Sequence, residues 1–420
     1  MSIDVIKQLQ TREPVLWINP GRQHIEPRES VDGYGFIHIK AAQNRLMRFA
    51  PYIRRAFPET EQRAGVIESE LIEIPKMREW LNENGAHIRG SLFLKDDAHL
   101  PIAGSVKARG GIHEVMTIAE RIGQREDMLW PADDYAKIDS DEFCEMYSRY
   151  TIQVGSTGNL GISIGRMAAR LGFKAIVHMS SDAKQWKKDL LRSEGVIVKE
   201  YAGDYSEAVA TGRHESESDP MSFFVDDENS EALFFGYATA ALRVKAQFRK
   251  RGIRVDGEHP LFLYLPCGVG GAPGGITFGF RELFGDHVHC FFAEPVDAPC
   301  FFLGMASGKG GDICVQDIGL SGRTSADGLA VSKPSAFACD RMKPMMSGAF
   351  TTTDEKMAVY QKEILRREQI RLEVSACAGF EGLMFAGDKE WGSYLKKHDL
   401  TPYMDQATHI VWGTGGGLMP

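Results

Sequence analysis

The sequence predicts an α/β protein built on parallel β-sheet, and three observations lead to that fold class. Helix-like and strand-like segments alternate over short connections between residues 161 and 201, a pattern typical of parallel βαβ units. A continuous apolar run at Leu261–Leu265 has the composition of a strand buried on both faces. Glycine is enriched, at 44 of 420 residues, and its clusters stand beside apolar segments, where loops approach a ligand closely.

The expected elements follow in chain order. Roughly the first 60 residues contain several prolines and show weak periodicity, so we expect an irregular extension that ends in a helix over residues 41–57. Further helices are expected over residues 112–122, 162–171, 182–192 and 230–250, and from Pro273 onward. Strands are expected over residues 174–179, 196–201, 261–265 and 409–412. No linker or repeat divides the chain, so a second domain would be inserted within the first.

Composition and charge narrow the class of protein. Hydrophobic residues make up 43% of the chain and charged residues 25%, close to the average of folded globular proteins. The formal net charge of −8 leaves no basic excess for nucleic acid or anionic lipid, and no apolar run reaches the ~18 residues that a membrane span needs. The seven scattered cysteines form no C-x-x-C pair and the amino terminus lacks an apolar signal segment, so we expect a cytoplasmic protein.

A glycine-rich loop follows the apolar run and reads Pro266-Cys-Gly-Val-Gly-Gly-Ala-Pro273. A buried strand that ends in glycines and leads into a helix places backbone N–H groups and the positive end of the helix dipole around an anion such as a phosphate. A dinucleotide fingerprint would need glycine at Pro273, yet Glu294 stands where a ribose-binding acid would fall, so a nicotinamide-dependent oxidoreductase stays open. Alternatively, these glycines only allow close helix packing.

A second motif, Ser105-Val-Lys107-Ala-Arg109-Gly-Gly, precedes the helix expected over residues 112–122. Two cations at the amino end of a helix oppose the helix dipole and cost a few tenths of a kcal/mol or more, so some group should compensate them. The motif is either a solvated basic turn or a site where the pKa of Lys107 is lowered and its amine forms a Schiff base with a carbonyl cofactor.

A third motif, Gly155-Ser156-Thr157-Gly158-Asn159, stands at a strand-to-helix turn. Its polar side chains either cap the following helix or, with the exposed backbone amides, bind a substrate carboxylate. A fourth glycine loop contains the hydroxyl of Thr414. A lysine for a Schiff base, amides for a carboxylate, amides for a phosphate and a terminal hydroxyl together predict a site for pyridoxal phosphate and an amino acid.

In chain order, these motifs resemble those of the fold-type II pyridoxal-phosphate enzymes, and most closely the bacterial D-serine dehydratase (D-serine ammonia-lyase) family. The resemblance extends over nearly the whole chain, through Trp17-x-Asn-Pro-Gly, Arg48-Phe-Ala-Pro-Tyr, Phe57-Pro-Glu-Thr, Ile67-Glu-Ser-Glu-Leu, Asp226-Asp-Glu-Asn-Ser, Phe292-Ala-Glu-Pro and Asp327-Gly-Leu-Ala-Val. The chains of that family continue past the position of Pro420, so we expect a further tail.

The resemblance implies a fold like that of the tryptophan synthase β subunit, with two open, twisted, mainly parallel sheets and helices on both faces. Residues 1–150 and 236–420 would form a large cofactor-binding domain with an amino-terminal extension. Residues 151–235 would form a small mobile domain. A monomer is expected, with a small amino-acid substrate as its partner.

The resemblance also implies roles for individual residues. Lys107 would form the Schiff base, Asn159 would bind the ring hydroxyl of the cofactor and Thr414 its pyridine nitrogen. The phosphate would lie on Gly268, Val269, Gly270 and Gly271, where Val269 and Ala272 depart from an all-glycine loop. Substrate binding falls to Ser156, Thr157, Gly158, Asn159 and Asp226.

The implied reaction is the β-elimination of D-serine to pyruvate and ammonia, a step of amino-acid catabolism, with slower turnover of D-threonine. Either Lys107 or, on the other face, Thr157 would remove the Cα proton. Within the same fold, L-threonine or L-serine dehydratase and serine racemase are the alternatives, and a binding-only protein without catalysis is another.

A monovalent cation site is implied at Glu294, Ala298 and Cys300, with K⁺ as the expected ion. One carboxylate with neutral oxygens suits a singly charged ion better than a divalent one. The alternative is that Glu294 only caps or pairs locally.

Overall fold

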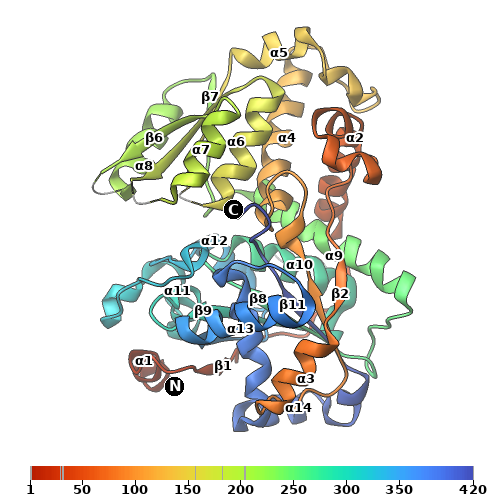
Figure 1. The fold of residues 1–420 in the computed structure, drawn as a ribbon, viewed down its shortest axis with the longest axis vertical. Coiled ribbons are helices and arrows are strands. Elements are labelled where there is room, and N and C mark those ends of the chain that lie inside the picture. Colours follow the sequence, from red (N-terminus) through yellow and green to blue (C-terminus); the bar gives the residue numbers. More distant parts are fainter. Residues whose placement is uncertain are drawn as a thin grey trace.

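Two β-sheets organise the chain, and Figure 1 shows the smaller one above the larger. The structure is a computed structural model that describes residues 2–28, 30, 33–156, 158–181, 183–202 and 205–419. The large sheet has the order β1 (Leu16–Ile18), β10 (Gly348–Thr352), β9 (Val288–Pro295), β8 (Leu261–Pro266), β11 (Thr408–Trp412), β3 (Ser91–Lys95) and β2 (Leu71–Glu73). Its two edge strands run antiparallel and its five inner strands run parallel.

The small sheet is wholly parallel. Its order is β6 (Ile197–Tyr201), β5 (Lys174–Ser180), β4 (Thr151–Gly155) and β7 (Ser222–Val225). Two mainly parallel sheets confirm the predicted fold class. The division into domains at residues 151 and 235 stays a prediction, and in both views α4 and α5 lie in the same layer as α6 of the small sheet.

The helices connect and cover these strands. They are α1 (Ser2–Gln10), α2 (Phe36–Ala56), α3 (Pro75–Glu83), α4 (Lys107–Arg125), α5 (Asp141–Ser148), α6 (Asn159–Leu171), α7 (Gln185–Ser193), α8 (Tyr205–Glu217), α9 (Glu231–Arg251), α10 (Gly271–Phe284), α11 (Cys300–Ser307), α12 (Ala336–Met342), α13 (Asp354–Glu368) and α14 (Lys389–Lys397). None of the helices in the described part of the chain is long and apolar enough to cross a membrane.

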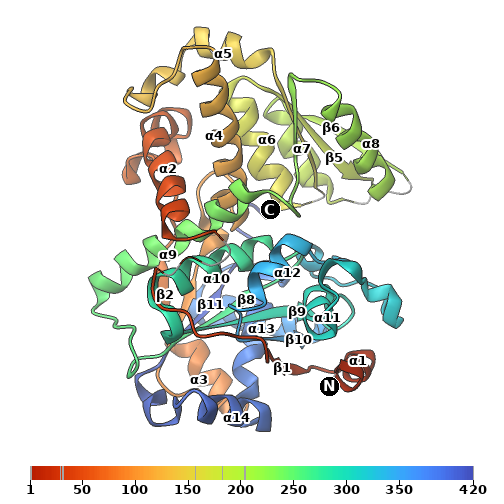
Figure 2. The same cartoon turned by 180° about the vertical axis from the view of Figure 1, so that it is seen from behind.

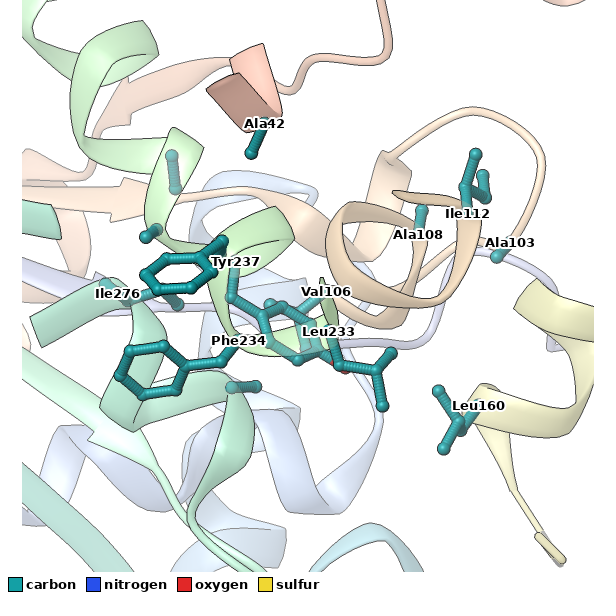
Figure 3. Packing of buried hydrophobic residues seen from close by; sticks show 14 of the residues in the cluster. Ala42, Ala103, Val106, Ala108, Ile112, Leu160, Leu233, Phe234, Tyr237 and Ile276 are labelled. Atoms are coloured by element: carbon teal, nitrogen blue, oxygen red, sulfur yellow. The ribbon is translucent and has the colours of Figure 1, made fainter. Parts of the chain in front are cut away.

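Strand β8 lies in the middle of the large sheet and is buried on both faces, as its apolar run predicts. Leu261, Leu263 and Leu265 belong to the core that includes α9 and α10, whereas Phe262 and Tyr264 face the core of α3, α13 and α14. Figure 3 shows the first of these cores, where Phe234 and Tyr237 of α9 pack beside Ile276 of α10. The glycine-rich loop that follows β8 is therefore anchored to a strand that cannot shift without disturbing both cores.

The predicted helices and strands occur within a few residues of their expected positions, but the expectation of an irregular amino-terminal extension is wrong in detail. Residues 2–10 form α1, and β1 pairs with β10 through the register Leu16 to Phe350. The backbone N–H of Val15 donates to Thr351 Oγ1 over 2.9 Å. A strand of three residues is too short to show an alternating pattern. Its conformation is instead set by pairing with β10, more than 300 residues away in the sequence.

A buried ion network lies beneath the first turn of α4. Arg109 donates through Nε to Asp97 Oδ2 over 2.7 Å and through a terminal nitrogen to Glu68 Oε1 over 2.7 Å. Asp97 also accepts from Trp412 Nε1 over 2.8 Å and from the hydroxyl of Ser69 over 2.7 Å. These carboxylates compensate the cation that the helix dipole opposes, and they connect α4 to the ends of β3 and β11.

We expect Asp97→Ala to lower the stability of the folded protein by about 3–5 kcal/mol, because it leaves the buried Arg109 guanidinium without its main partner. Thermal unfolding followed by circular dichroism measures the change. Asp133→Ala, which removes an exposed ion pair with Lys137, is the matched control and should cost under about 1 kcal/mol. Equal melting temperatures for the two variants would contradict the prediction.

Candidate active site

A cavity of about 510 Å³ opens at the carboxyl ends of parallel strands from both sheets. Residues that follow β4 and β7 of the small sheet line one part of it, and residues that follow β8 and β11 of the large sheet line the other. Ligands of open α/β sheets bind at this edge, because the loops there are free of the sheet's own hydrogen bonds. The cavity brings together Lys107, Ser156, Gly158, Asn159, Asp226, Gly268, Val269, Gly270, Gly271 and Thr414. Their individual roles stay predictions.

Lys107 is the first residue of α4, and its amine enters the cavity. Nζ lies 3.1 Å from Asp227 Oδ2 and 3.3 Å from Oδ1. It also lies 5.8 Å from the centre of the buried Tyr237 ring. Burial alone lowers the pKa of Lys107, but the carboxylate of Asp227 and then Tyr237 outweigh it, so the pKa is raised above its ordinary value.

The predicted lowering of the Lys107 pKa is therefore wrong. The sequence shows the cation and the helix dipole but not Asp227, which lies 120 residues further on and follows β7. The acidic run Asp226-Asp-Glu-Asn-Ser, just before the helix expected over residues 230–250, was the available signal. The neighbouring Asp226, for which substrate binding stays a prediction, lines the cavity and pairs with Arg213 over 3.4 Å.

The turn between β4 and α6 is organised by the hydroxyl of Ser156. Its Oγ accepts from the backbone N–H groups of Gly158 over 3.2 Å and of Gly161 over 3.1 Å, so this side chain does cap the start of the helix. Asn159 donates through Nδ2 to Glu373 Oε1 over 2.9 Å, across the cavity. Thr157, predicted to bind the substrate carboxylate and to act as a base, lies outside the described residues.

The loop after β8 forms a tight glycine cradle at the start of α10. Gly270 precedes the helix with φ of +106°, and a Cβ there would lie 2.2 Å from the Phe301 ring. The first N–H groups of a helix have no partner within it, so those of this loop are available to an anion in the cavity. Neither Val269 nor Ala272 has a positive φ, so their side chains fit without backbone strain.

Thr414 follows β11 and also lines the cavity. Its carbonyl oxygen accepts from the backbone N–H of Val106 over 2.8 Å, and Ser105 forms an isolated antiparallel bridge with Gly415. The terminal glycine loop and the segment that carries Lys107 are thus joined directly.

Glu294, Ala298 and Cys300, the predicted cation site, lie outside the lining of this cavity. Both oxygens of Glu294 accept backbone N–H groups at the start of α11, from Phe301 over 2.8 Å and from Phe302 over 2.7 Å. Glu294 thus has the local capping role that the sequence left open. Burial raises the pKa of its carboxyl to about 8. No cluster of three or more histidine, cysteine, aspartate or glutamate side chains suited to a metal occurs among the residues that the structure describes.

Comparison with known proteins adds the family context. The family described as "Pyridoxal-phosphate dependent enzyme" matches residues 66–393. A probable D-serine dehydratase of Bacillus mycoides is 51% identical over 417 residues, which are 99% of this chain and 94% of that protein. One of Halalkalibacterium halodurans is 52% identical with the same coverage. The crystal structure of diaminopropionate ammonia lyase from Escherichia coli in complex with D-serine has a TM-score of 0.71 at 17% identity, and the match covers 96% of this chain and 94% of that one.

In protein free of cofactor, Asp227→Asn should lower the pKa of Lys107 relative to the wild type, because the largest raising effect is removed while burial still lowers the pKa and Tyr237 still raises it. More of the amine is then neutral near pH 8, so we expect trace acetic anhydride to label Lys107 at least several-fold faster than in the wild type, as quantified by mass spectrometry of the peptides. Asp226→Asn is the control, because Asp226 pairs with Arg213 rather than with Lys107. Identical labelling of both variants would refute the assignment.

Proposed function

Because the chain belongs to the family of pyridoxal-phosphate-dependent enzymes, we propose that it catalyses the β-elimination of D-serine to pyruvate and ammonia, and more slowly acts on D-threonine. One observation carries the proposal: an amine, a polar glycine turn and a glycine cradle at a helix start surround one cavity. The choice of D-serine rests on relatives of similar length that are about half identical and are named for that substrate.

The residues present fit pyridoxal phosphate. The cavity volume of about 510 Å³ lies within the range of cofactor sites. A Cβ on Gly271 would meet the chain no closer than 3.4 Å, at Asp227 O, so the cradle is open on that side. Residues 268–271 of the loop after β8 would hold the phosphate, and Lys107 would bind the aldehyde carbon. Asn159 would bind the ring hydroxyl and Thr414 the ring nitrogen. When bound, the cofactor supplies an electron sink for the negative charge that develops at the substrate Cα.

Lys107 and Asp227 control the proton on Nζ. To act as a nucleophile or a base, the amine must lose that proton, and Asp227 opposes the loss while the ion pair is intact. As Nζ leaves the 3.1 Å contact, its proton would pass to the Asp227 carboxylate, and burial then favours the neutral amine. Asp227 thus keeps the amine protonated until it is engaged.

The turn at Ser156, Gly158 and Asn159 would bind the substrate carboxylate through backbone N–H groups. This fixes the amino acid with Cα beside Lys107. For the D enantiomer the base that removes the Cα proton would be Lys107 Nζ, if that proton faces the amine, or Thr157, which lies outside the described residues.

The family match argues against the nicotinamide-dependent alternative. We also propose that the protein is a monomer of the reducing cytoplasm. All seven of its cysteines are free, which suits a compartment in which thiols stay reduced.

We further propose that a monovalent cation such as K⁺ binds beside Glu294. The carboxylate is fully buried, and its partners given above are backbone N–H groups rather than a cationic side chain. Cys300 connects this region to the cradle, since its thiol is 3.5 Å from the carbonyl oxygen of Gly268. A cation held here would therefore support the loop that binds the phosphate.

Purified holoenzyme should release pyruvate from D-serine, more slowly form the oxo acid from D-threonine, and act poorly on L-serine. A coupled lactate dehydrogenase assay on each enantiomer measures this. Lys107→Ala should lose the visible absorbance of the bound cofactor and several orders of magnitude in rate, because the covalent nucleophile is deleted. Turnover of L-serine or L-threonine equal to that of D-serine would favour an L-specific dehydratase.

Cation binding predicts a defined pH dependence. Because the folded pKa of Glu294 is about 8 against an ordinary 4.5, the folded chain retains a proton there that the unfolded chain has lost. The contribution of Glu294 to the free energy of unfolding therefore falls as the pH rises from about 4.5 to 8, because the buried carboxylate becomes charged. A bound cation should offset this loss. We expect K⁺ to raise the melting temperature and the rate more at pH 8 than at pH 6, relative to tetramethylammonium at equal ionic strength. Glu294→Gln should abolish the difference, and indifference of the wild type to the cation would leave Glu294 as a cap alone.

A further inference from the structure

Lys187 is a buried lysine beside the active site with no assigned role. It lies in the first turn of α7, and its side chain is only 3% exposed. Positive charge in the first turn of a helix is disfavoured by the helix dipole, and burial of an ammonium adds to the cost. Such a placement requires a compensating anion.

Among the described residues, Lys187 shares its counter-charge with a second lysine, and its only aromatic contact is with the Trp186 ring, 5.6 Å from Nζ. Lys187 Nζ lies 3.3 Å from Asp327 Oδ2, and Lys184 Nζ lies 3.1 Å from the same oxygen. Two ammonium groups thus share one carboxylate. The nearby carboxyl of Glu373 accepts from Asn159, and burial raises its pKa, which weakens it as a counter-charge.

The ammonium of Lys187 lies close to the turn at Ser156, Gly158 and Asn159. A Cβ on Gly158 would lie 3.9 Å from Lys187 Nζ. The two cations that line the described part of the cavity are committed elsewhere, since Lys107 pairs with Asp227 and Arg213 with Asp226. Lys184 is 48% exposed and therefore screened by water.

We propose that Lys187 supplies the positive charge that recognises the carboxylate of the substrate at this turn, with Asp327 as its partner when no substrate is bound. The inference rests on the proposed function in that it requires an amino-acid substrate at the turn. Lys187 belongs to α7 beside the small sheet, and Asp327 belongs to a loop beside the large sheet. The substrate carboxylate would therefore compete with Asp327 for the ammonium of Lys187.

The test measures the affinity of the holoenzyme for D-alanine and for D-alaninamide from the change in cofactor absorbance. D-Alanine keeps the carboxylate but has no β-hydroxyl to lose, and the amide removes only the charge. Lys187→Gln should weaken D-alanine binding by about 10- to 100-fold and change D-alaninamide by less than about 3-fold, the range expected for loss of a charge-assisted contact. Lys187→Arg should restore most of the affinity.

Lys184→Gln is the matched control, because it makes the same change of charge at the same carboxylate and should alter neither ligand by more than about 3-fold. Asp327→Asn removes the competing anion and should tighten D-alanine binding, which keeps the proposal testable if Lys187→Gln does not fold. Unchanged binding in Lys187→Gln, equal weakening of both ligands, or weaker D-alanine binding in Asp327→Asn would overturn it.

The wild-type measurement separates this inference from the proposed function. The same pair of ligands is titrated as L enantiomers. If the wild type binds the L enantiomers but not the D enantiomers, D-serine is not the substrate. The effect of Lys187→Gln is then measured on the affinity for L-alanine relative to L-alaninamide. If the wild type binds neither alanine, both proposals fail.

Discussion

The ion network around Arg109 is the constraint on which the rest of the site depends. Arg109 lies two residues after Lys107, and its charge is tolerated at a helix start because Asp97 and Glu68 accept its hydrogen bonds. Asp97 also accepts from Trp412, two residues before Thr414. One buried carboxylate therefore holds together the segments that carry the amine and the terminal hydroxyl, in addition to the direct hydrogen bond from the Val106 N–H to the Thr414 carbonyl oxygen.

The electrostatics of the cavity depend on pairs that span different elements. Asp227 follows a strand of the small sheet and acts on Lys107 at the start of α4, while Asn159 of α6 reaches Glu373. Because each pair joins segments far apart in sequence, the proton held at Lys107 depends on how the start of α4 lies against the end of β7. Protonation of the amine is in this sense a property of the whole fold.

The sequence predicts the parts of the site that are local and misses the parts that are not. Glycine turns after apolar strands mark the cradle and the polar turn, because both follow from backbone geometry within a few residues. Lys107 is recognisable for the same reason, as a cation at an unfavourable helix end. The direction of its pKa shift was wrong because Asp227 is supplied by another element, and Tyr237 carries no motif at all. Strand β1 was missed because pairing with β10, rather than its own composition, determines its conformation.

The large sheet ends on both sides in strands of three residues, β1 and β2, each antiparallel to its neighbour. A parallel sheet exposes rows of unpaired backbone groups at its edges, and a second chain can add to them. Here the amino-terminal segment covers one row and residues 71–73 cover the other, with strands too short to recruit a further chain. The amino-terminal segment therefore protects the sheet against edge-to-edge aggregation. Proteolytic loss of residues 16–18 would leave the edge of β10 unpaired and open to a strand of another chain.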